Sequence, residues 1–561
     1  MFWNRLKHWA PEIILLSLVG FLQFFRLGIG EIQSWDEALY IIRAEACLRF
    51  GVWIDQAQYA IGGIYSSTHP PLVVWMMAIA RYFGGNSVFV SRIIAAIAGI
   101  VGLFFFYKLA GKFFSRWTRL IITICLGSAQ GYLHFSHRGQ FDIPMFAFIT
   151  ASVYYAVRSF EENDWKLAAI AGLMFGSALM SKAAQGLYLL PFLTALPYVF
   201  RSTNWKKHIL IILGVAAAVA LPWYVFMMLK HPQFYGDFAA MLSSMKTGTF
   251  TNRVATQWWY YLNQIFIEFP LLILGVMVIP QITRRFKTGD SIYNRFLLIS
   301  FAWLFGMLIF LSSFQIKMAQ YSMHLLLPTS LILSYIIEEF LQYPPKIGRS
   351  VLSLGLLGFS IAWSSSETVR KAIREHHVAS LHPSLILIAG LVLLTVILAV
   401  FIRGKLRIYG QVALLFGAAI LLVLVEFYQW ANLENASYVD GAEQVGNVLL
   451  HTSEIHSLTA YHEDFPHEIY LPQLNYYSNS WFLGWDPSKF GQTKTWDELD
   501  SLIKIDAVPR SDAAIIYVSW DEVNMPILDT GGRLTRLNQG LAVHYAKALH
   551  TKKYQLYWDP K

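Results

Sequence analysis

The sequence predicts an all-α polytopic membrane protein with about 13 transmembrane helices and a small α/β domain at its C-terminal end. Three observations predict this fold class. Hydrophobic residues make up 56% of the 561 residues and charged residues only 14%, whereas soluble domains carry about 25% charged residues. Apolar runs of about 20 residues, the length of a membrane-spanning helix, recur along the chain. Beyond residue 430 these runs stop, and Asp, Glu, Asn and Ser occur throughout.

The apolar runs divide the chain into two domains. The candidate spans are residues 11–28, 88–107, 120–135, 142–157, 166–181, 186–200, 208–228, 262–282, 296–314, 319–338, 350–364, 384–402 and 411–430. The first run follows a basic segment but has no small-residue cleavage site after it, which indicates an uncleaved first span. We expect residues 1–430 to form the transmembrane domain and residues 431–561 a soluble domain. In the latter, the apolar segment 514–520 is typical of a buried strand.

One short apolar stretch decides the predicted topology. Residues 69–85 begin with His69 and two prolines, and their apolar part would reach only about 20 Å as a helix, short of the hydrocarbon core of about 30 Å. If this stretch lies along the interface, the basic loops all become cytoplasmic, in agreement with the positive-inside rule. These loops are residues 5–7, 108–119, 201–207, 284–287, 346–349 and 403–407. We therefore expect interfacial helices in the first outer loop.

The extracytoplasmic face then gathers the remaining charged groups. It receives Asp36, Glu37, His69, Arg138, Asp142, Lys182, Arg253, Lys317 and the soluble domain. The catalytic loops would be residues 30–87, 134–142 and 229–261, on the outer face of the inner (plasma) membrane. The positive-inside rule keeps basic loops in the cytoplasm, and this accounts for the formal net charge of +9. We therefore expect a lipid bilayer as partner and no nucleic acid.

Three acidic residues are candidates for catalysis. Asp36 and Glu37 precede a segment of mixed charge, typical of a helix that lies on a bilayer. The structural alternative makes Asp36 a helix cap and Glu37 a first-turn acid. Asp142 stands four residues after Arg138, so the two could form a structural pair. Polar groups at the membrane edge pay a desolvation cost, and this gives a functional role of the two residues the same weight as the structural one.

Cationic residues of the same face are candidates for holding a phosphate. Lys182 follows one predicted span, and Lys317 lies one helical turn before Tyr321 at the start of another. Lysines at membrane ends often serve only as anchors, and an isolated histidine such as His69 is usually structural. Several cations on one face nevertheless suit a lipid phosphate, with Arg253 and His69 as weaker candidates than Lys182 and Lys317.

These residue types fit one reaction class, the transfer of a sugar from a polyprenyl phosphate to a hydroxyl group. A carboxylate would accept the proton of the acceptor hydroxyl. Fixed cations would stabilise the charge that grows on the phosphate leaving group. A nucleotide-sugar donor would require a cytoplasmic site, which the predicted topology does not provide.

Six segments of the chain resemble, in order, the superfamily of aminoarabinose transferases and protein O-mannosyltransferases, which are class C glycosyltransferases. The segments are WDEALY, STHPPL, SHRGQFD, SALMSKAAQGLYLLP, PWYVFMMLKHPQF and FLSSFQIKMAQYSMHLLLP, and the resemblance covers roughly residues 1–340. It implies a lipid-phosphate sugar donor, a lipid, glycan or protein acceptor, and a fold with thirteen spans and a C-terminal extracytoplasmic domain.

The resemblance also implies roles for individual residues. Asp36 matches the catalytic acid of the first outer loop, and Asp142 matches the second acidic position. Lys317 and Tyr321 match a lysine–tyrosine element near the donor phosphate, and Lys182 matches a lysine common at its place. Where aminoarabinose transferases carry Glu-Lys before the proline pair, this chain has Thr68-His69. The sequence therefore fixes neither the aminoarabinose donor nor a cofactor, and it leaves a divalent metal open.

Two other function classes compete with this hypothesis. A secondary transporter would bind its substrate near the bilayer midplane, often between internal repeats, whereas here the charges gather at one face and no repeat is visible. A ligase or polymerase of whole glycans would use a lipid-diphosphate donor. Vesicle transport assays would identify the first, and product analysis with a monosaccharide donor would identify the second.

Overall fold

The computed structural model describes most of the chain. The described residues are 12–33 without 15, 36–57, 69–247, 257–288, 290–343, 415–424, 427, 440–462 without 453, 454 and 456, 472–478, 493–508, 511–518, 532–551 and 553–559. Arg253 and the predicted spans 350–364 and 384–402 lie outside these residues. The chain divides into two compact units. The first is Met1–Leu27, Thr68–Met76 and Arg92–Asn432, and the second is Gly28–Ser67, Met77–Ser91 and Leu433–Lys561.

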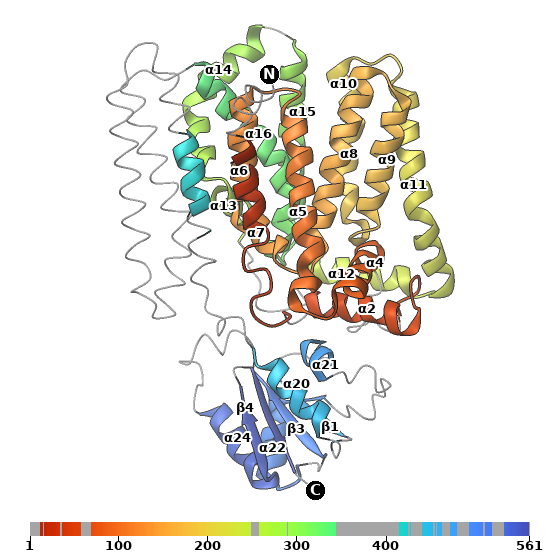
Figure 1. The fold of residues 1–561 in the computed structure, drawn as a ribbon, viewed down its shortest axis with the longest axis vertical. Coiled ribbons are helices and arrows are strands. Elements are labelled where there is room, and N and C mark those ends of the chain that lie inside the picture. Colours follow the sequence, from red (N-terminus) through yellow and green to blue (C-terminus); the bar gives the residue numbers. More distant parts are fainter. Residues whose placement is uncertain are drawn as a thin grey trace. The chain divides into compact units, whose positions relative to one another are not determined.

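Helices build the first unit (Figure 1). They are α5 (Val88–Ala110), α6 (Arg116–Gly127), α7 (Gln130–Ser136), α8 (Asp142–Glu162), α9 (Trp165–Leu179), η2 (Ala183–Leu189), α10 (Leu190–Phe200), α11 (Trp205–Lys230), α12 (Phe234–Thr247), α13 (Tyr260–Glu268), η3 (Pro270–Leu274), α14 (Gly275–Thr288), α15 (Ile292–Ser312), η4 (Ala319–Ser322) and α16 (Met323–Gln342). Within the described residues, α5, α8, α11, α15 and the segment Ala319–Gln342 are long and apolar enough to cross a membrane. The bent pair Tyr260–Glu268 and Pro270–Arg285 would add a sixth span.

Several predicted spans have a different shape in the structure. Residues 120–135, predicted as one span, form parts of two helices, because α6 ends at Gly127 and α7 begins at Gln130. The predicted span 262–282 is bent by 96° at the break between α13 and η3. Residues 69–85 contain the 13-residue helix α4 (Leu72–Gly84), which is too short to cross a core of about 30 Å. Its position along the membrane interface stays a prediction.

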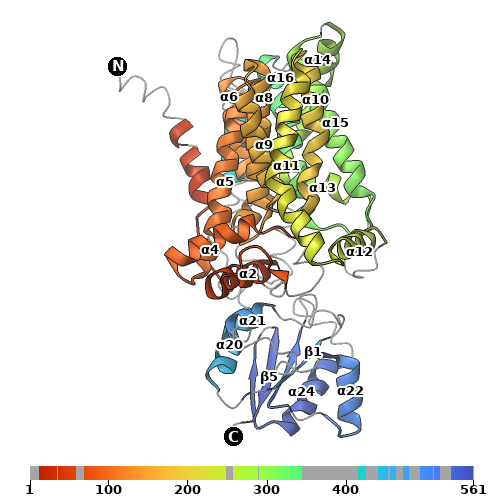
Figure 2. The same ribbon diagram turned by 90° about the vertical axis from the view of Figure 1, so that its right-hand side faces the viewer.

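Helices α9 and α11 pack closely in the first unit (Figure 2). Two glycines of α9, one turn apart, allow this approach. A Cβ atom at Gly172 would lie 2.6 Å from the carbonyl oxygen of Ile212, and one at Gly176 would lie 2.7 Å from Cβ of Val219. Small residues at a spacing of four let helix backbones meet in this way inside membranes. The packing fixes the direction in which α9 ends, at Leu179, just before Lys182.

The C-terminal part of the second unit is a five-stranded sheet covered by helices. Its strands are β1 (Leu458–His462), β2 (Thr493–Thr495), β3 (Ala513–Tyr517), β4 (Lys547–His550) and β5 (Tyr554–Trp558), in the order β2-β1-β3-β5-β4. β1 pairs in parallel with β2 and β3, whereas β5 pairs antiparallel with β3 and β4. The accompanying helices are α20 (Ala442–His451), α21 (Pro472–Ser478), α22 (Trp496–Lys504) and α24 (Arg533–His544).

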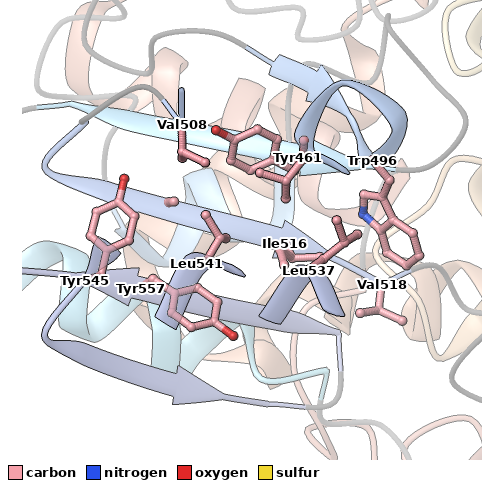
Figure 3. Close-up of a cluster of buried hydrophobic side chains, with 11 residues drawn as sticks. Tyr461, Trp496, Val508, Ile516, Val518, Leu537, Leu541, Tyr545 and Tyr557 are labelled. Atoms are coloured by element: carbon pink, nitrogen blue, oxygen red, sulfur yellow. The ribbon is translucent and has the colours of Figure 1, made fainter. Parts of the chain in front are cut away.

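The sheet is buried on both faces, which explains the apolar character of its central strand. One cluster contains Ala514 and Ile516 of β3 together with Leu499 of α22 and Leu537 of α24 (Figure 3). The opposite cluster contains Ala513 and Ile515 of β3 with residues of α20 and α21. Successive side chains of a strand point to opposite faces. A strand covered by helices on both sides is therefore apolar throughout.

The second unit also contains helix α2 (Asp36–Phe50) of the first outer loop. Residues 37–47 of α2 are all buried, including Arg43 and Glu45. The buried charges of this segment make contacts inside the protein, and whether α2 also lies along the membrane stays a prediction. Glu45 accepts hydrogen bonds from Arg81 Nε at 2.7 Å and from Arg49 Nε at 3.1 Å. Arg43 Nε donates to Oε1 of Gln56 at 2.9 Å, so both buried charges have polar partners.

Candidate active site

An ion pair between Asp142 and Lys182 lies at the centre of the candidate site in the first unit. Asp142 is the first residue of α8, and Lys182 immediately precedes η2. The ammonium group of Lys182 donates to both carboxylate oxygens, at 2.7 and 2.8 Å. The two side chains are only 1% and 4% exposed. The structure thus brings together two residues that the sequence predicted separately for the outer face.

The segment that begins with His69 lies beside this ion pair. The ring of His69 is 5.9 Å from the ring of Phe141, the neighbour of Asp142 in the chain. The N–H group of Leu72, at the start of α4, donates to the carbonyl oxygen of Met180 at 3.2 Å. His69 is buried, and it belongs to the same neighbourhood as Asp142 and Lys182.

Lys317 and Tyr321 lie in the connection between α15 and α16. Lys317 precedes the short helix η4, so the two residues do not share a helical turn as the sequence suggested. The Lys317 ammonium donates to the carbonyl oxygen of Phe314 at 2.7 Å. Lys317 is 4% exposed, and this burial lowers the pKa of its side chain below the ordinary value.

Two residues that the sequence analysis missed connect Lys182 with Tyr321. Nε2 of His324, in α16, lies 3.1 Å from Oε1 of Gln185, in η2. The ring of His324 is 4.6 Å from that of Tyr188 and 6.3 Å from that of Tyr321. Gln185 and His324 each follow a predicted site residue by three positions. A search for polar residues at helical spacing from Lys182 and Tyr321 would have found them.

The remaining predicted residues have different positions. Arg138 is half-buried in the turn between α7 and α8, four residues before Asp142. Asp36 and Glu37 belong to the second unit, in the first turn of α2. Glu37 is buried, and its Oε2 accepts the N–H group of Gln33 at 2.7 Å, which ties the first turn of α2 to the segment before it. Asp36 is half-buried. Among the described residues, no group of three or more His, Cys, Asp or Glu side chains has the arrangement of a metal site.

Comparison with known proteins relates this architecture to one superfamily. The family model for dolichyl-phosphate-mannose-protein mannosyltransferase matches residues 68–226. A relative in Pseudomonas savastanoi, undecaprenyl phosphate-alpha-4-amino-4-deoxy-L-arabinose arabinosyl transferase, is 26% identical over 58% of this chain and 61% of its own length. A protein of the same description in Pseudomonas fluorescens is 24% identical over 63% of each chain. The chain thus spans about three fifths of the length of these two relatives.

A solved structure extends the similarity of fold to nearly the whole chain. ArnT from Cupriavidus metallidurans, bound to undecaprenyl phosphate, matches with a TM-score of 0.63 over 98% of both chains, at 13% identity. The same protein in the apo state matches equally well. The apolar helices and this shared fold define the chain as a multi-pass membrane protein. In sequence it is similar to the aminoarabinose transferases and, over residues 68–226, to the protein mannosyltransferase family.

Proposed function

We propose that this protein is a membrane glycosyltransferase that moves a sugar from a polyprenyl-phosphate donor to a hydroxyl group of a lipid, glycan or protein acceptor. The observation that carries the proposal is the buried Asp142–Lys182 pair, with His69 and the Gln185–His324 contact beside it. Both the matching family model and the relatives are described as transferases that use lipid-linked sugars. A buried cation held by a carboxylate is a fixed partner for a phosphate group.

In this proposal Asp142 is a positioning residue for Lys182. An ammonium group has three N–H donors, and the two hydrogen bonds to Asp142 use two of them. The third is left for a phosphate oxygen of the donor. Lys317 supplies a second cation, and its low exposure strengthens its attraction for an anion. The negative charge that grows on the leaving phosphate is thereby stabilised as the sugar departs.

Asp36 is the base that accepts the proton of the acceptor hydroxyl. Glu37 beside it is buried, and its carboxylate accepts the N–H group of Gln33. Asp36 is more exposed than Glu37, as a group that meets an incoming acceptor must be. The proposal needs no acid for the leaving group, since a phosphate departs as an anion, and it assigns no step to a metal ion.

The proposed location is the inner membrane, with about 13 spans and with the active site and the C-terminal α/β domain on the extracytoplasmic side. The support is the distribution of charge. If α4 does not cross, the basic segments 108–119 and 201–207 fall on one side and Asp36, Asp142 and Lys182 on the other. Polyprenyl-phosphate sugars that face outward would then reach the site directly from the bilayer.

Product analysis tests the proposed function. The purified protein is reconstituted in liposomes with a panel of undecaprenyl-phosphate monosaccharides and a cell-envelope extract as acceptor. We expect mass spectrometry to detect an acceptor that is heavier by one glycosyl residue, together with free undecaprenyl phosphate. The same reaction with EDTA measures any need for a divalent metal. Transfer from lipid-diphosphate glycans alone, or movement of a solute without a glycosylated product, would contradict the proposal.

A further inference from the structure

The side chain of Glu31 forms a cap for a helix of the C-terminal domain, and both belong to the second unit. Its Oε2 accepts the backbone N–H groups of Asp440 at 2.8 Å and Gly441 at 3.0 Å, and its Oε1 accepts that of Glu443 at 3.1 Å. These residues form the N-terminal end of α20. The side-chain amide of Gln473, in α21, adds a contact at 3.3 Å. Glu31 is 2% exposed, and a buried carboxylate satisfies the free N–H groups of a helix start.

Three consecutive residues connect α20 and α21 to the start of α2. Glu31 binds the N-terminal end of α20. The N–H group of Ile32 donates to the hydroxyl oxygen of Tyr477, in α21, at 2.8 Å. The N–H group of Gln33 donates to Glu37, in the first turn of α2. A displacement of the C-terminal helices would therefore be transmitted to the turn that carries Asp36.

A second connection joins α2 to α21 through Arg81, in α4. Arg81 donates to Glu45 of α2 through Nε at 2.7 Å. A terminal nitrogen of the same guanidinium lies 3.3 Å from the hydroxyl oxygen of Tyr476, next to Tyr477 in α21. Arg81 is 2% exposed, and a planar guanidinium holds its partners in a fixed geometry. The segment before α2 thus contacts the C-terminal domain directly, and the middle of α2 is connected to the domain through Arg81.

The part of the C-terminal domain that receives Glu31 is itself held in place. The ammonium group of Lys553, at the start of β5, donates to the carboxylate of Asp440 at 2.8 Å, and both residues are buried. The N–H group of Lys553 donates to the carbonyl oxygen of Asp440 at 3.0 Å. Asp440, whose N–H group binds Glu31, is therefore connected to strand β5 of the sheet through Lys553.

We propose that Glu31 and Arg81 are positioning residues, through which the C-terminal domain holds α2 and its Asp36 in the geometry needed for sugar transfer. This inference rests on the proposed function, in which Asp36 is the base. It gives the C-terminal domain a direct part in catalysis, because the domain determines where the acid of the first outer loop lies. Misplacement of a catalytic group by about 1 Å can lower a rate by about 100-fold.

Variants of the full-length protein test this inference. Glu31→Ala should lower single-turnover sugar transfer by about 10- to 100-fold with the affinity for undecaprenyl phosphate unchanged. Glu31→Gln, which keeps an acceptor oxygen, should retain more activity. The control is Glu498→Ala, which removes an exposed capping carboxylate from α22 in the same domain, where Glu498 accepts the N–H group of Thr495 at 2.6 Å. This control should leave transfer unchanged.

Hydrogen exchange of the amides in residues 36–50 gives a readout that does not depend on activity. Glu31→Ala should accelerate exchange in α2, and Glu498→Ala should not. Unchanged exchange in Glu31→Ala would overturn the inference. Faster exchange with normal transfer would also overturn it, since α2 would then be held but not for catalysis. If the wild-type protein transfers no sugar, the proposed function fails, and the exchange data still decide whether Glu31 positions α2.

Discussion

Lys182 and Asp142 lie 40 residues apart in the chain and form a buried ion pair between the segment before η2 and the start of α8. Asp142 opens α8, and Lys182 follows the end of α9. Removing two charges from water is costly, and only close, well-directed hydrogen bonds offset that cost. The pair therefore constrains the local fold and also keeps a cation in the interior of the candidate site.

The first prediction separates these two roles of the ion pair. Lys182→Met leaves the carboxylate of Asp142 buried without its cation, so the free energy of unfolding should fall by about 3–5 kcal/mol. The double variant Lys182→Met/Asp142→Asn removes both charges and should regain most of that stability. Both variants should bind undecaprenyl phosphate weakly. Thermal unfolding in detergent and ligand titration provide the two measurements.

The control for this prediction is Lys166→Met, which removes an exposed lysine from the first turn of α9. It should change neither stability nor donor affinity, since exposed charges contribute little. Normal donor affinity in the double variant would assign Lys182 a purely structural role.

The second prediction concerns pH and Lys317. Burial lowers the pKa of this lysine below its ordinary value of 10.5. Only the charged form attracts the phosphodiester of the donor, which stays singly negative over the neutral and alkaline range. The advantage of the wild type over Lys317→Met in donor affinity should therefore shrink as the pH rises through the lowered pKa. Titrations of both proteins from pH 7 upward test this. A difference that stays constant with pH would show that Lys317 does not act through its charge.

The third prediction concerns Asp36. Asn has nearly the shape of Asp but cannot accept a proton, and general-base catalysis typically contributes about 10²–10⁴-fold. Single-turnover transfer by Asp36→Asn should fall by about that factor while donor binding is preserved. If Asp36 serves only as a helix cap, Asp36→Asn should keep near-normal transfer, because Asn caps a helix about as well as Asp. Near-normal transfer would therefore leave Asp36 with a structural role, and the base would have to be sought at Glu37 or Asp142.

The fourth prediction concerns topology. Thr203, in the connection between α10 and α11, is exposed beside Arg201, and Ser501 is exposed on α22. We expect a cysteine at position 203 to react only after the membrane is made permeable. A cysteine at position 501 should react with a membrane-impermeant maleimide in intact cells. The two native cysteines, Cys47 and Cys125, are buried and give a low background. Labelling of both positions from the same side would contradict the proposed topology.

The sequence predicted the membrane class and several members of the candidate site because these depend on local composition. Apolar length indicates a spanning helix, and charges at the ends of apolar runs identified Asp142 and Lys182. Their direct contact was not predictable, because it depends on how α9 ends and η2 begins. The break between α6 and α7 was missed because residues 120–135 are apolar enough for one helix, whereas Ser128 and Ala129 interrupt the helical hydrogen bonds.

Contacts between distant segments escaped the sequence analysis altogether. Glu31 carries no motif, and its backbone partners lie 409 to 412 residues further along the chain. Asp36 and Glu37 looked equally suitable for catalysis, and the sequence did not reveal that Glu37 is buried whereas Asp36 is half-buried. Arg43 and Glu45 are buried and have the partners Gln56 and Arg81, and composition alone does not reveal such contacts.

The two glycines of α9 bear on how a genetic screen of this protein should be read. Any larger residue at Gly172 or Gly176 would collide with α11 and push the end of α9, together with Lys182, out of place. Random mutagenesis that selects for lost function should therefore recover these positions as often as the charged residues, although neither glycine has a side chain that could touch a substrate. Suppressor mutations on α11 should be rare, because the atoms nearest the two glycines are the backbone carbonyl oxygen of Ile212 and the Cβ atom of Val219, and a smaller side chain removes neither unless it is glycine.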